Sequence, residues 1–491
     1  FNDNNNGATA MQQVAATRRV AVADPRTGRR EFDLAVADGK AVAAVAARLR
    51  QAQKAWAAMG IDARMAVLAR WGEQVNGPFR QAIIDADSRD TGYGEISRIA
   101  PDMMVNFLRG SMASAKAQIA AAYREGVSRS NPQICFRTLL KPYALVGVIS
   151  PWNAPTMLSM LRAIPPLFAG CAVLVKPSEV TPRFAKAVRA SIEAVPELAA
   201  VFDFVYGDGE TGQAVIQSTD YISFTGSVPN GRKVAEACAR RLIPCDLELG
   251  GKDPLVILGS ANIDDAVSAA LRGGVTSTGQ VCFAIERIYV DERIHDAFIA
   301  KLIERAAKIR INHPDPLNGQ LGPFTGPMQA GIVDAHLDDA LLKGAKLVAG
   351  GKSFVLDGGR YMRPTILTDV THDMLLMQQE TFGPVMPVMR FKTADEAVRL
   401  ANDTQYGLSA AVMAGTEEEA LAVAERIDAG NVSVQDAFLT FHAAEAQSDR
   451  FGASGVAGSR PGLMRYLRRQ ALLINRGKPA CLSDESLKAA G

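Results

Sequence analysis

Two residues of this chain, a glutamate and a cysteine, could together do chemistry, and each lies in a glycine-containing segment. Glu248 lies in LELGGKDP (247–254), and Cys282 follows Gly279 in STGQVCFAIERIYV (277–290), 34 positions further on. A thiolate is a nucleophile, and a carboxylate crowded by apolar side chains has a raised pKa that suits a general base. The two residue types together indicate covalent chemistry through a thioester.

Each of the two residues also has an ordinary explanation. A single cysteine before an apolar strand is usually a small buried hydrophobe, and Glu248 could be a solvated charge. Gly279 favours the functional interpretation, because a glycine permits close backbone approach and lets the Cys282 N–H face a substrate oxygen. No histidine is near in sequence, so activating the thiol requires another base or a cation.

A possible oxyanion-binding amide occurs upstream. SPWNAP (150–155) follows an apolar segment, and its two prolines and Trp152 fix a rigid loop that presents Asn153. One positioned donor in an oxyanion hole typically stabilises a transition state by about 3–4 kcal/mol. The alternative is that Asn153 only forms a turn.

Two further segments bear on a cofactor. KPSE (176–179) ends an apolar strand, at the edge where open α/β sheets bind ligands, so Lys176 and Glu179 could hold the ribose hydroxyls of a dinucleotide. A surface turn is the equal alternative. GDGETG (207–212) matches a phosphate-binding glycine pattern, but the acidic residue expected about 20 residues later is missing, so an ordinary turn is favoured.

The elements that must position these residues alternate along the chain. The first 125 residues or so are expected to be mostly helical, with a helix over 40–59, a second that Asp62 caps and that runs to Asn76, and a third segment near 100–123. Short apolar strands then alternate with helices, which predicts βαβ units, parallel sheets and the α/β class. Strands are expected at 134–150 (two pieces), 171–176, 201–207, 221–226, 245–251, 254–259, 285–290, 386–391, 408–414, 431–434 and 467–475.

Composition excludes several classes of function. The 491 residues suffice for two or three domains, and 54 basic against 52 acidic residues give no reason to expect nucleic acid. The six cysteines form no CxxC pair and the five histidines show no zinc spacing, so we expect free thiols, a reducing compartment and no metal. No apolar run reaches about 18 residues, so no membrane span is expected and cytoplasm is the default.

Residues 1–10 are interpreted as a tag or disordered arm.

Taken together, the segments resemble the aldehyde dehydrogenase superfamily from about Met11 to Arg476. SPWNAP, KPSE, FTGS (224–227), LELGGKDP, GQVC and ETFGPV (380–385) occur in the family's order. The resemblance implies an α/β fold with a Rossmann-like NAD-binding domain, an α/β catalytic domain and a small β oligomerisation flap, assembled as a homodimer or homotetramer. The implied limits are 11–124 and 142–250 for the first, 251–442 for the second, 125–141 and 465–491 for the flap and C-terminal tail, and 443–464 for a substrate-entrance segment.

The resemblance also implies roles. Cys282 would be the nucleophile, Asn153 and the Cys282 N–H the oxyanion hole, and Glu248 the base that activates a hydrolytic water. NAD is the expected cofactor because Glu179 would repel a 2′-phosphate, while Lys176 leaves NADP possible. The implied cofactor contacts are Trp152 and Ser227 near the pyrophosphate, Lys176 and Glu179 at the ribose, Gly209 on the adenine side, Leu249 and Gly250 near the nicotinamide, Glu380 at its ribose, and Phe382 beside its ring.

The function so implied is NAD(P)-dependent oxidation of an aldehyde to a carboxylic acid, of the hydrolytic, non-CoA-acylating type because Glu248 is present. The alternatives are a CoA-acylating semialdehyde dehydrogenase and a non-catalytic scaffold relative. An apolar pocket is expected from Ala154, Leu158, Leu161, Val281 and Phe283, which suggests aromatic or medium-chain aldehydes. Arg162 is the only basic candidate for an acidic substrate, and segment 437–464 departs from the family's pattern.

Overall fold

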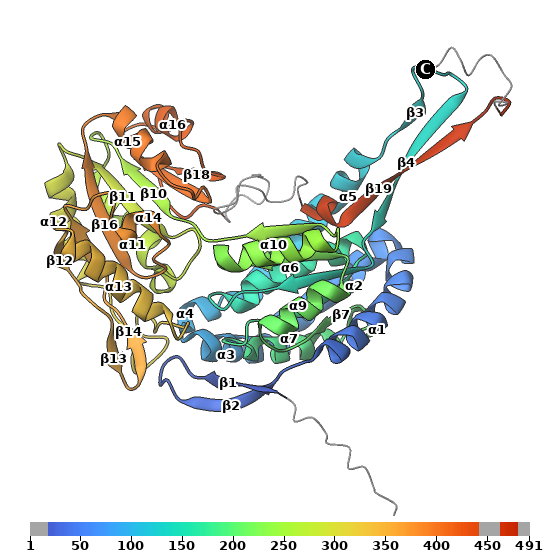
Figure 1. The fold of residues 1–491 in the computed structure, drawn as a ribbon, viewed down its shortest axis with the longest axis horizontal. Helices are drawn as coiled ribbons and strands as arrows, with labels where there is room; N and C mark the ends of the chain where they lie inside the picture. The colour runs from blue at the N-terminus through green and yellow to red at the C-terminus, as the bar shows by residue number, and fades with distance from the viewer. Residues whose placement is uncertain (1–17, 441–461, 480–491) are drawn as a thin grey trace, which may run out of the picture.

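The chain forms two α/β lobes and a projecting arm of strands (Figure 1). The structure is a computed structural model, and it describes residues 18–440 and 462–479. The first lobe is built on a five-stranded parallel sheet in the order β7-β6-β5-β8-β9. Its strands are β5 (Leu145–Ile149), β6 (Ala172–Lys176), β7 (Phe202–Phe204), β8 (Tyr221–Thr225) and β9 (Cys245–Glu248).

This strand order creates a topological switch point. The chain adds β6 and β7 on one side of β5 and then returns to place β8 and β9 on the other. Every residue of β5, β6 and β8 is buried, as expected for strands covered by helices on both faces. Ligands of such sheets bind at the carboxyl ends of the strands beside the switch point, which here carry the loops that begin at Ser150 and Gly226.

Helices make up most of the rest of the first lobe. In α1 the buried residues Val42, Ala46, Leu49, Gln53 and Trp56 recur every three or four positions and form one face, and α1, α6 and α9 each contact β5 and β6. The helices are α1 (Gly39–Ala58), α2 (Gly60–Asn76), α3 (Arg80–Thr91), α4 (Gly94–Ser97), α5 (Ala100–Ala122), α6 (Pro155–Ala169), α7 (Arg183–Glu193), α8 (Pro196–Ala199), α9 (Gly209–Ser218) and α10 (Val228–Arg240).

One expectation for this region was wrong, and one hairpin was not anticipated. Asp62 does not cap α2; Met59 occupies the cap, and Asp62 lies within the first turn, where its charge still favours the helix dipole. An antiparallel hairpin of β1 (Arg19–Ala23) and β2 (Arg30–Ala35) precedes the helices, and its weak apolar alternation was not recognised.

The second lobe contains a seven-stranded sheet in the order β12-β15-β16-β11-β10-β17-β18, parallel except for β12. Its strands are β10 (Asp253–Ile257), β11 (Ile285–Asp291), β12 (Lys346–Ala349), β15 (Thr365–Thr368), β16 (Val385–Phe391), β17 (Ser409–Met413) and β18 (Asn431–Val434), with a separate hairpin of β13 (Phe354–Leu356) and β14 (Gly359–Tyr361). Its helices are α11 (Ile263–Val275), η1 (Thr276–Gly279), α12 (His295–Ala306), α13 (Gln329–Leu342), α14 (Leu375–Gln378), α15 (Ala394–Asn402) and α16 (Glu417–Ala424).

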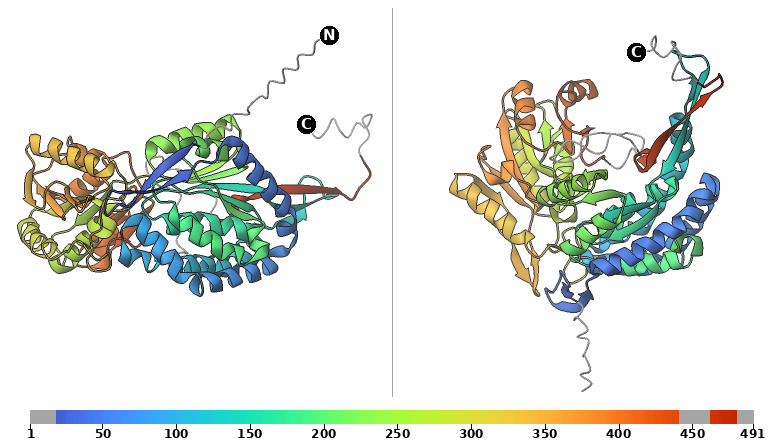
Figure 2. Two further views of the ribbon diagram at one scale, coloured as in Figure 1. Left: turned by 90° about the horizontal axis from the view of Figure 1, so that it is seen from below. Right: turned by 45° about the vertical axis from the view of Figure 1, so that its right-hand side comes forward.

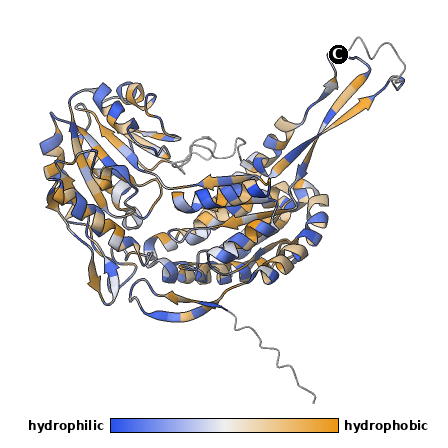
Figure 3. Cartoon of the chain, in the orientation of Figure 1, coloured by the Kyte–Doolittle hydropathy of each residue, from blue (hydrophilic) through white to orange (hydrophobic). Residues whose placement is uncertain are grey.

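The arm is a three-stranded antiparallel sheet in the order β19-β4-β3. Its strands are β3 (Glu125–Val127), β4 (Ile134–Pro142) and β19 (Leu467–Asn475), and the short η3 (Gly462–Tyr466) leads into it. The strand expected at 467–475 therefore pairs with β4 over nine residues rather than with either large sheet. The arm extends away from both lobes (Figure 2), and its strands carry hydrophobic residues (Figure 3), among them the exposed Phe136, Leu473 and Ile474.

The predicted strands agree with the structure, whereas the hairpins, α3, α13, β12 and β15 were not anticipated. The interpretations of residues 1–10, of most of 443–464, of the last 12 residues and of Cys481 fall outside the described residues. Within the described ranges, no helix is both long and apolar enough to cross a membrane.

Candidate active site

Cys282 lies on a tight loop between η1 and β11. Ser277, Thr278 and Gly279 all adopt left-handed backbone conformations, with φ of 51°, 58° and 70°. A Cβ atom added to Gly279 would lie 2.3 Å from the carbonyl carbon of Gly383, so only glycine allows this loop to pack against the segment before β16. The nucleophile loop is thereby fixed against the ETFGPV segment, about 100 residues away in the chain.

Asn153 contacts the same loop from the first lobe. Its side-chain amide donates a hydrogen bond of 2.9 Å to the carbonyl oxygen of Gln280. Gln280 is fully buried, and its own side chain accepts a hydrogen bond from the Thr325 N–H at 3.1 Å. Because an amide carries two N–H groups, Asn153 keeps one donor beside the Cys282 loop. Gln280 was not singled out from the sequence, although it lies within the GQVC motif.

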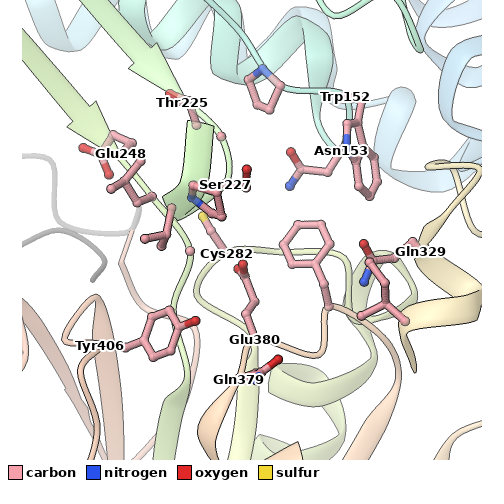
Figure 4. Close-up of a pocket in the computed structure, with 18 of the residues that line it drawn as sticks. Trp152, Asn153, Thr225, Ser227, Glu248, Cys282, Gln329, Gln379, Glu380 and Tyr406 are labelled. Atoms are coloured by element: carbon pink, nitrogen blue, oxygen red, sulfur yellow. The ribbon is translucent and has the colours of Figure 1, made fainter. Parts of the chain in front are cut away.

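Glu248 is the last residue of β9 and forms an ion pair with Arg162 of α6. Burial raises the pKa of the Glu248 carboxyl, and the Arg162 guanidinium opposes that rise. The carboxylate points away from the Cys282 sulfur (Figure 4). Arg162 also lies 3.3 Å from Asp246, so the only basic candidate for an acidic substrate is paired with two carboxylates of the protein instead.

Asn153, Glu248 and Cys282 line one cavity of about 560 Å³ between the lobes. Figure 4 shows the Cys282 side chain with Asn153, Glu248 and Glu380 around it. Burial and the nearby carboxylates of Glu248, Glu380 and Asp253 raise the pKa of the Cys282 thiol. The thiol is therefore protonated at neutral pH in this arrangement. The other walls are formed by Pro151, Trp152, Leu158, Thr225, Gly226, Ser227, Val228, Pro229, Arg232, Leu249, Gly250, Gln329, Ile332, Gln379, Glu380, Phe382, Gln405 and Tyr406.

A buried carboxylate behind the cavity holds the segment that carries Glu380 and Phe382. The two oxygens of Glu286 accept hydrogen bonds of 2.7 Å from the N–H groups of Thr381 and Phe382, and Glu286 also binds the Lys252 ammonium at 2.6 Å. Phe382 is kept in a left-handed conformation with φ of 55°. Neither Lys252 nor Glu286 was singled out from the sequence, although LELGGKDP contains the lysine.

Glu380 and Phe382 face the cavity from this segment. Burial and the neighbouring Glu286 raise the pKa of Glu380 to about 8, against a hydrogen bond from the Gly251 N–H. The Phe382 ring meets the Trp152 indole edge to face, with centroids 5.5 Å apart. A Cβ atom on Gly250 would lie 2.2 Å from a Glu380 oxygen, which explains the glycine at that position.

A second cavity of about 640 Å³ adjoins the first and shares Trp152 and Ser227 with it. It contains Lys176 and Glu179, whose charged groups lie 3.0 Å apart. It is further lined by Ile149, Ser150, Pro151, Ser178, Val180, Asp208, Gly209, Gly212, Gln213, Ile216, Phe224, Thr225, Gly226, Asn230, Lys233, Val234, Gly326, Pro327, Met328 and Gln329.

This second cavity presents hydrogen-bonding groups of the kind that a dinucleotide needs. Ser227 caps α10, yet its side chain makes no capping hydrogen bond within the described structure. The first-turn N–H groups of Val228 and Asn230 therefore remain available to an anion, whereas Pro229 has none. An ion-paired lysine and glutamate at the end of β6 offer a donor and an acceptor for ribose hydroxyls. All nine predicted cofactor residues line one cavity or the other.

The predicted substrate pocket agrees less well. Leu158 lines the catalytic cavity, but Ala154, Leu161, Val281 and Phe283 are not on its walls as the described residues form them. Phe283 instead packs against Phe438, with ring centroids 4.4 Å apart. A sequence position next to Asn153 or Cys282 does not fix the direction of its side chain. No group of three or more His, Cys, Asp or Glu residues that could hold a metal ion occurs in the described ranges.

Comparison with known proteins agrees with the geometry. The model of the aldehyde dehydrogenase family matches residues 12–470. A putative succinate-semialdehyde dehydrogenase [NADP(+)] from Mycolicibacterium smegmatis is 34% identical over 473 residues, 95% of this chain and 91% of that protein.

Two solved structures are also similar. The putative aldehyde dehydrogenase PutA from Anabaena variabilis has a TM-score of 0.90 and 43% identity, with 95% of this chain and 99% of that one covered. Betaine aldehyde dehydrogenase from Staphylococcus aureus, in complex with NAD+, has a TM-score of 0.88 and 28% identity, with 95% and 93% covered. The chain therefore belongs to the aldehyde dehydrogenase family, and it is an oxidoreductase that acts on aldehydes with NAD or NADP.

Proposed function

We propose that this protein oxidises an apolar aldehyde to the carboxylic acid through a thioester on Cys282. The observation that carries the proposal is the shared cavity of Cys282, Asn153 and Glu248, which adjoins a second cavity with Lys176 and Glu179. A nucleophile, an amide donor and a carboxylate thus come together beside a place for a dinucleotide.

The first step is attack of the Cys282 thiolate on the aldehyde carbon. A carbon–sulfur bond forms, and the carbonyl electron pair moves onto oxygen. The free N–H of the Asn153 amide and the backbone N–H of Cys282 donate to that oxyanion, which is worth about 3–4 kcal/mol for one such donor. Since the thiol has a raised pKa among the carboxylates around it, a positive charge arriving in the cavity would favour the thiolate.

NAD(P), when bound, supplies the two-electron oxidation that converts the adduct into a thioester. Lys176 and Glu179 would hold a ribose, the start of α10 at Ser227 the pyrophosphate, and Glu380 and Phe382 the nicotinamide end. Lys176 is already paired with Glu179, and the carboxylate would repel a 2′-phosphate, so we propose NAD as the preferred cofactor. A relative named for NADP and a related structure with NAD+ support use of either.

The last step is hydrolysis of the thioester. Glu248 takes a proton from water as the water oxygen attacks the thioester carbon, and the carbon–sulfur bond then breaks to release the carboxylic acid and the Cys282 thiolate. Glu248 must be ionised for this, and Arg162 supports the ionised form. The presence of a base for water favours hydrolysis over transfer to CoA.

The substrate is proposed to be aromatic or of medium chain length. Leu158, Leu249, Ile332, Phe382 and Tyr406 give the catalytic cavity apolar walls. Succinate semialdehyde is a second candidate, because Arg232 brings a cation to the same cavity and a relative is named for that substrate.

We also propose that the arm mediates assembly into a dimer or tetramer. Leu473 and Ile474 of β19 are 74% and 40% exposed in the single chain, and burying them against a second copy would be favourable.

An aldehyde panel with Cys282→Ser as the control tests the function. Reduced nicotinamide is followed by absorbance with aliphatic, aromatic and succinate semialdehydes, with each cofactor, and with and without CoA. We expect the highest kcat/KM for an apolar aldehyde, no requirement for CoA, and no activity in Cys282→Ser. Full activity of Cys282→Ser would contradict the mechanism, and strict dependence on CoA would favour acyl transfer.

A further inference from the structure

A buried cluster of four charged side chains lies directly behind Glu248. The charge cluster consists of Arg162 from α6, Asp246 and Glu248 from β9, and Arg465 from η3. None of the four side chains is more than 15% exposed. Three separate parts of the chain therefore place two positive and two negative charges under the cavity.

Arg162 bridges the two carboxylates. One of its terminal nitrogens lies 3.3 Å from Asp246, and the other forms the ion pair with Glu248. Asp246 and Glu248 are two positions apart on one strand and so point to the same face, where their charges repel. The guanidinium between them relieves that repulsion, and the pKa of Arg162 is raised above its usual range by both carboxylates in spite of burial.

Asp246 fixes Arg162 from the side away from the cavity. It also accepts a hydrogen bond of 2.9 Å from the Ser223 hydroxyl and faces Arg465 at 3.5 Å. One Asp246 oxygen, Oδ1, and the Nε of Arg162 have no hydrogen-bond partner among the described residues. A buried ion pair that serves only stability normally has its hydrogen bonds satisfied, so the unused atoms leave Asp246 able to hold the guanidinium by further contacts when Glu248 turns away.

We propose that Arg162 is a positioning residue for Glu248. It holds the Glu248 side chain ionised and turned away from the thiol, and Asp246 retains the guanidinium when Glu248 turns toward its water. This inference rests on the proposed role of Glu248 as the base of the hydrolytic step.

The groups facing Glu248 act on its ionisation in opposite directions. Burial raises the pKa of Glu248 and so does Asp246 on the same strand, while Arg162 and Arg465 lower it. The Cys282 thiol faces it across the cavity. Removal of the Arg162 charge should thus raise the pKa of Glu248, and removal of the Asp246 charge should lower it.

The test is the pH dependence of thioester hydrolysis, measured by quenched flow on enzyme acylated at Cys282. Measuring this step directly makes the result independent of which step limits turnover. Hydrolysis needs ionised Glu248, so its rate rises with pH through the pKa of that residue. This rise is the acid limb of the pH profile. Arg162→Met should move the acid limb to higher pH by about 1–3 units, the usual effect of one adjacent charge on the pKa of a carboxylate. At low pH the hydrolysis rate should then fall about tenfold for every pH unit by which the limb moves.

Three further variants separate charge from structure. Arg162→Lys should restore most of the position of the limb, and Asp246→Asn should move it to lower pH. Arg50→Met is the matched control. It breaks a two-point ion pair between Arg50 of α1 and Asp220, both outside the two cavities, and should leave the limb in place. If Arg162→Met does not fold, the lysine and Asp246 variants still decide the question.

An unchanged limb in both Arg162→Met and Asp246→Asn, or movement of the limb in the same direction in both, would overturn the inference. Glu248→Gln distinguishes this failure from that of the proposed function. Thioester hydrolysis at the normal rate in Glu248→Gln means that another group is the base, and both ideas fail. Stalled hydrolysis in Glu248→Gln with an unmoved limb in the Arg162 variants removes only the positioning role.

Discussion

Glu286 offers a prediction that links the stability of the second lobe to cofactor binding. Its carboxylate is 3% exposed, binds the fully buried Lys252 ammonium, and receives the N–H groups of Thr381 and Phe382. Glu286→Gln removes the charge while keeping the shape. The amide nitrogen of the new side chain cannot accept a hydrogen bond, so at least one N–H loses its partner and Lys252 loses its counter-ion.

The size of the effect follows from these contacts. Leaving one partner of a buried ion pair uncompensated costs about 3–5 kcal/mol of stability. The 380–382 segment would also relax, since the Glu286 carboxylate keeps Phe382 in its left-handed conformation, which by itself costs about 1–3 kcal/mol. We therefore expect a loss of about 3–5 kcal/mol and a raised KM for NAD(P).

Urea denaturation followed by circular dichroism measures the stability, and initial rates at varied NAD(P) measure the KM. Glu292→Gln is the control, because Glu292 is exposed directly after the same strand and its change should stay within about 0.5 kcal/mol. The double variant Lys252→Met with Glu286→Gln removes both charges and should recover part of the lost stability. A loss below about 1 kcal/mol in Glu286→Gln, with an unaltered KM, would refute this reasoning.

Two other perturbations have clear expected results. Gly279→Ala should reduce kcat about a hundredfold and lower thermal stability, because its Cβ would lie 2.3 Å from Gly383 and its φ is 70°. Normal rates and a normal melting temperature would contradict the close packing. Glu380→Gln should change the pH dependence of stability. The pKa of Glu380 is near 4.5 in the unfolded chain and is raised to about 8 in the folded protein, so this carboxyl lowers the stability as pH rises from 4.5 through 8. The variant should therefore gain stability relative to the parent at pH 9 but not at pH 4, as urea midpoints at the two values would show; equal differences at both would count against a buried, protonated Glu380.

The positions of strands and motifs could be predicted because they depend on residues that are close together in the sequence. The apolar run before Lys176 and the Gly-Gly pair after Glu248 each specify a strand end, and strand ends at a switch point meet at one edge. The partners of these residues are not local. Glu286 accepts hydrogen bonds from residues 95 and 96 positions away, and nothing in the sequence near either end indicates that pairing.

The direction of side chains was also beyond local reasoning. Leu158 and Leu161 are both apolar residues of α6, yet only Leu158 reaches the catalytic cavity as the described residues form it. Arg162, one position later, turns to the two carboxylates of β9. Which face of α6 meets the cavity depends on how β9 and η3 pack against it, and that packing comes from segments more than 80 residues away.

The most direct test of the mechanism is mass spectrometry of Glu248→Gln after mixing with an apolar aldehyde and NAD(P). The mechanism predicts one equivalent of reduced nicotinamide in a rapid burst, followed by stalled turnover, with the acyl group retained on the peptide that contains Cys282. Continued turnover at the parent rate, or an acyl group found on any other residue, would contradict it.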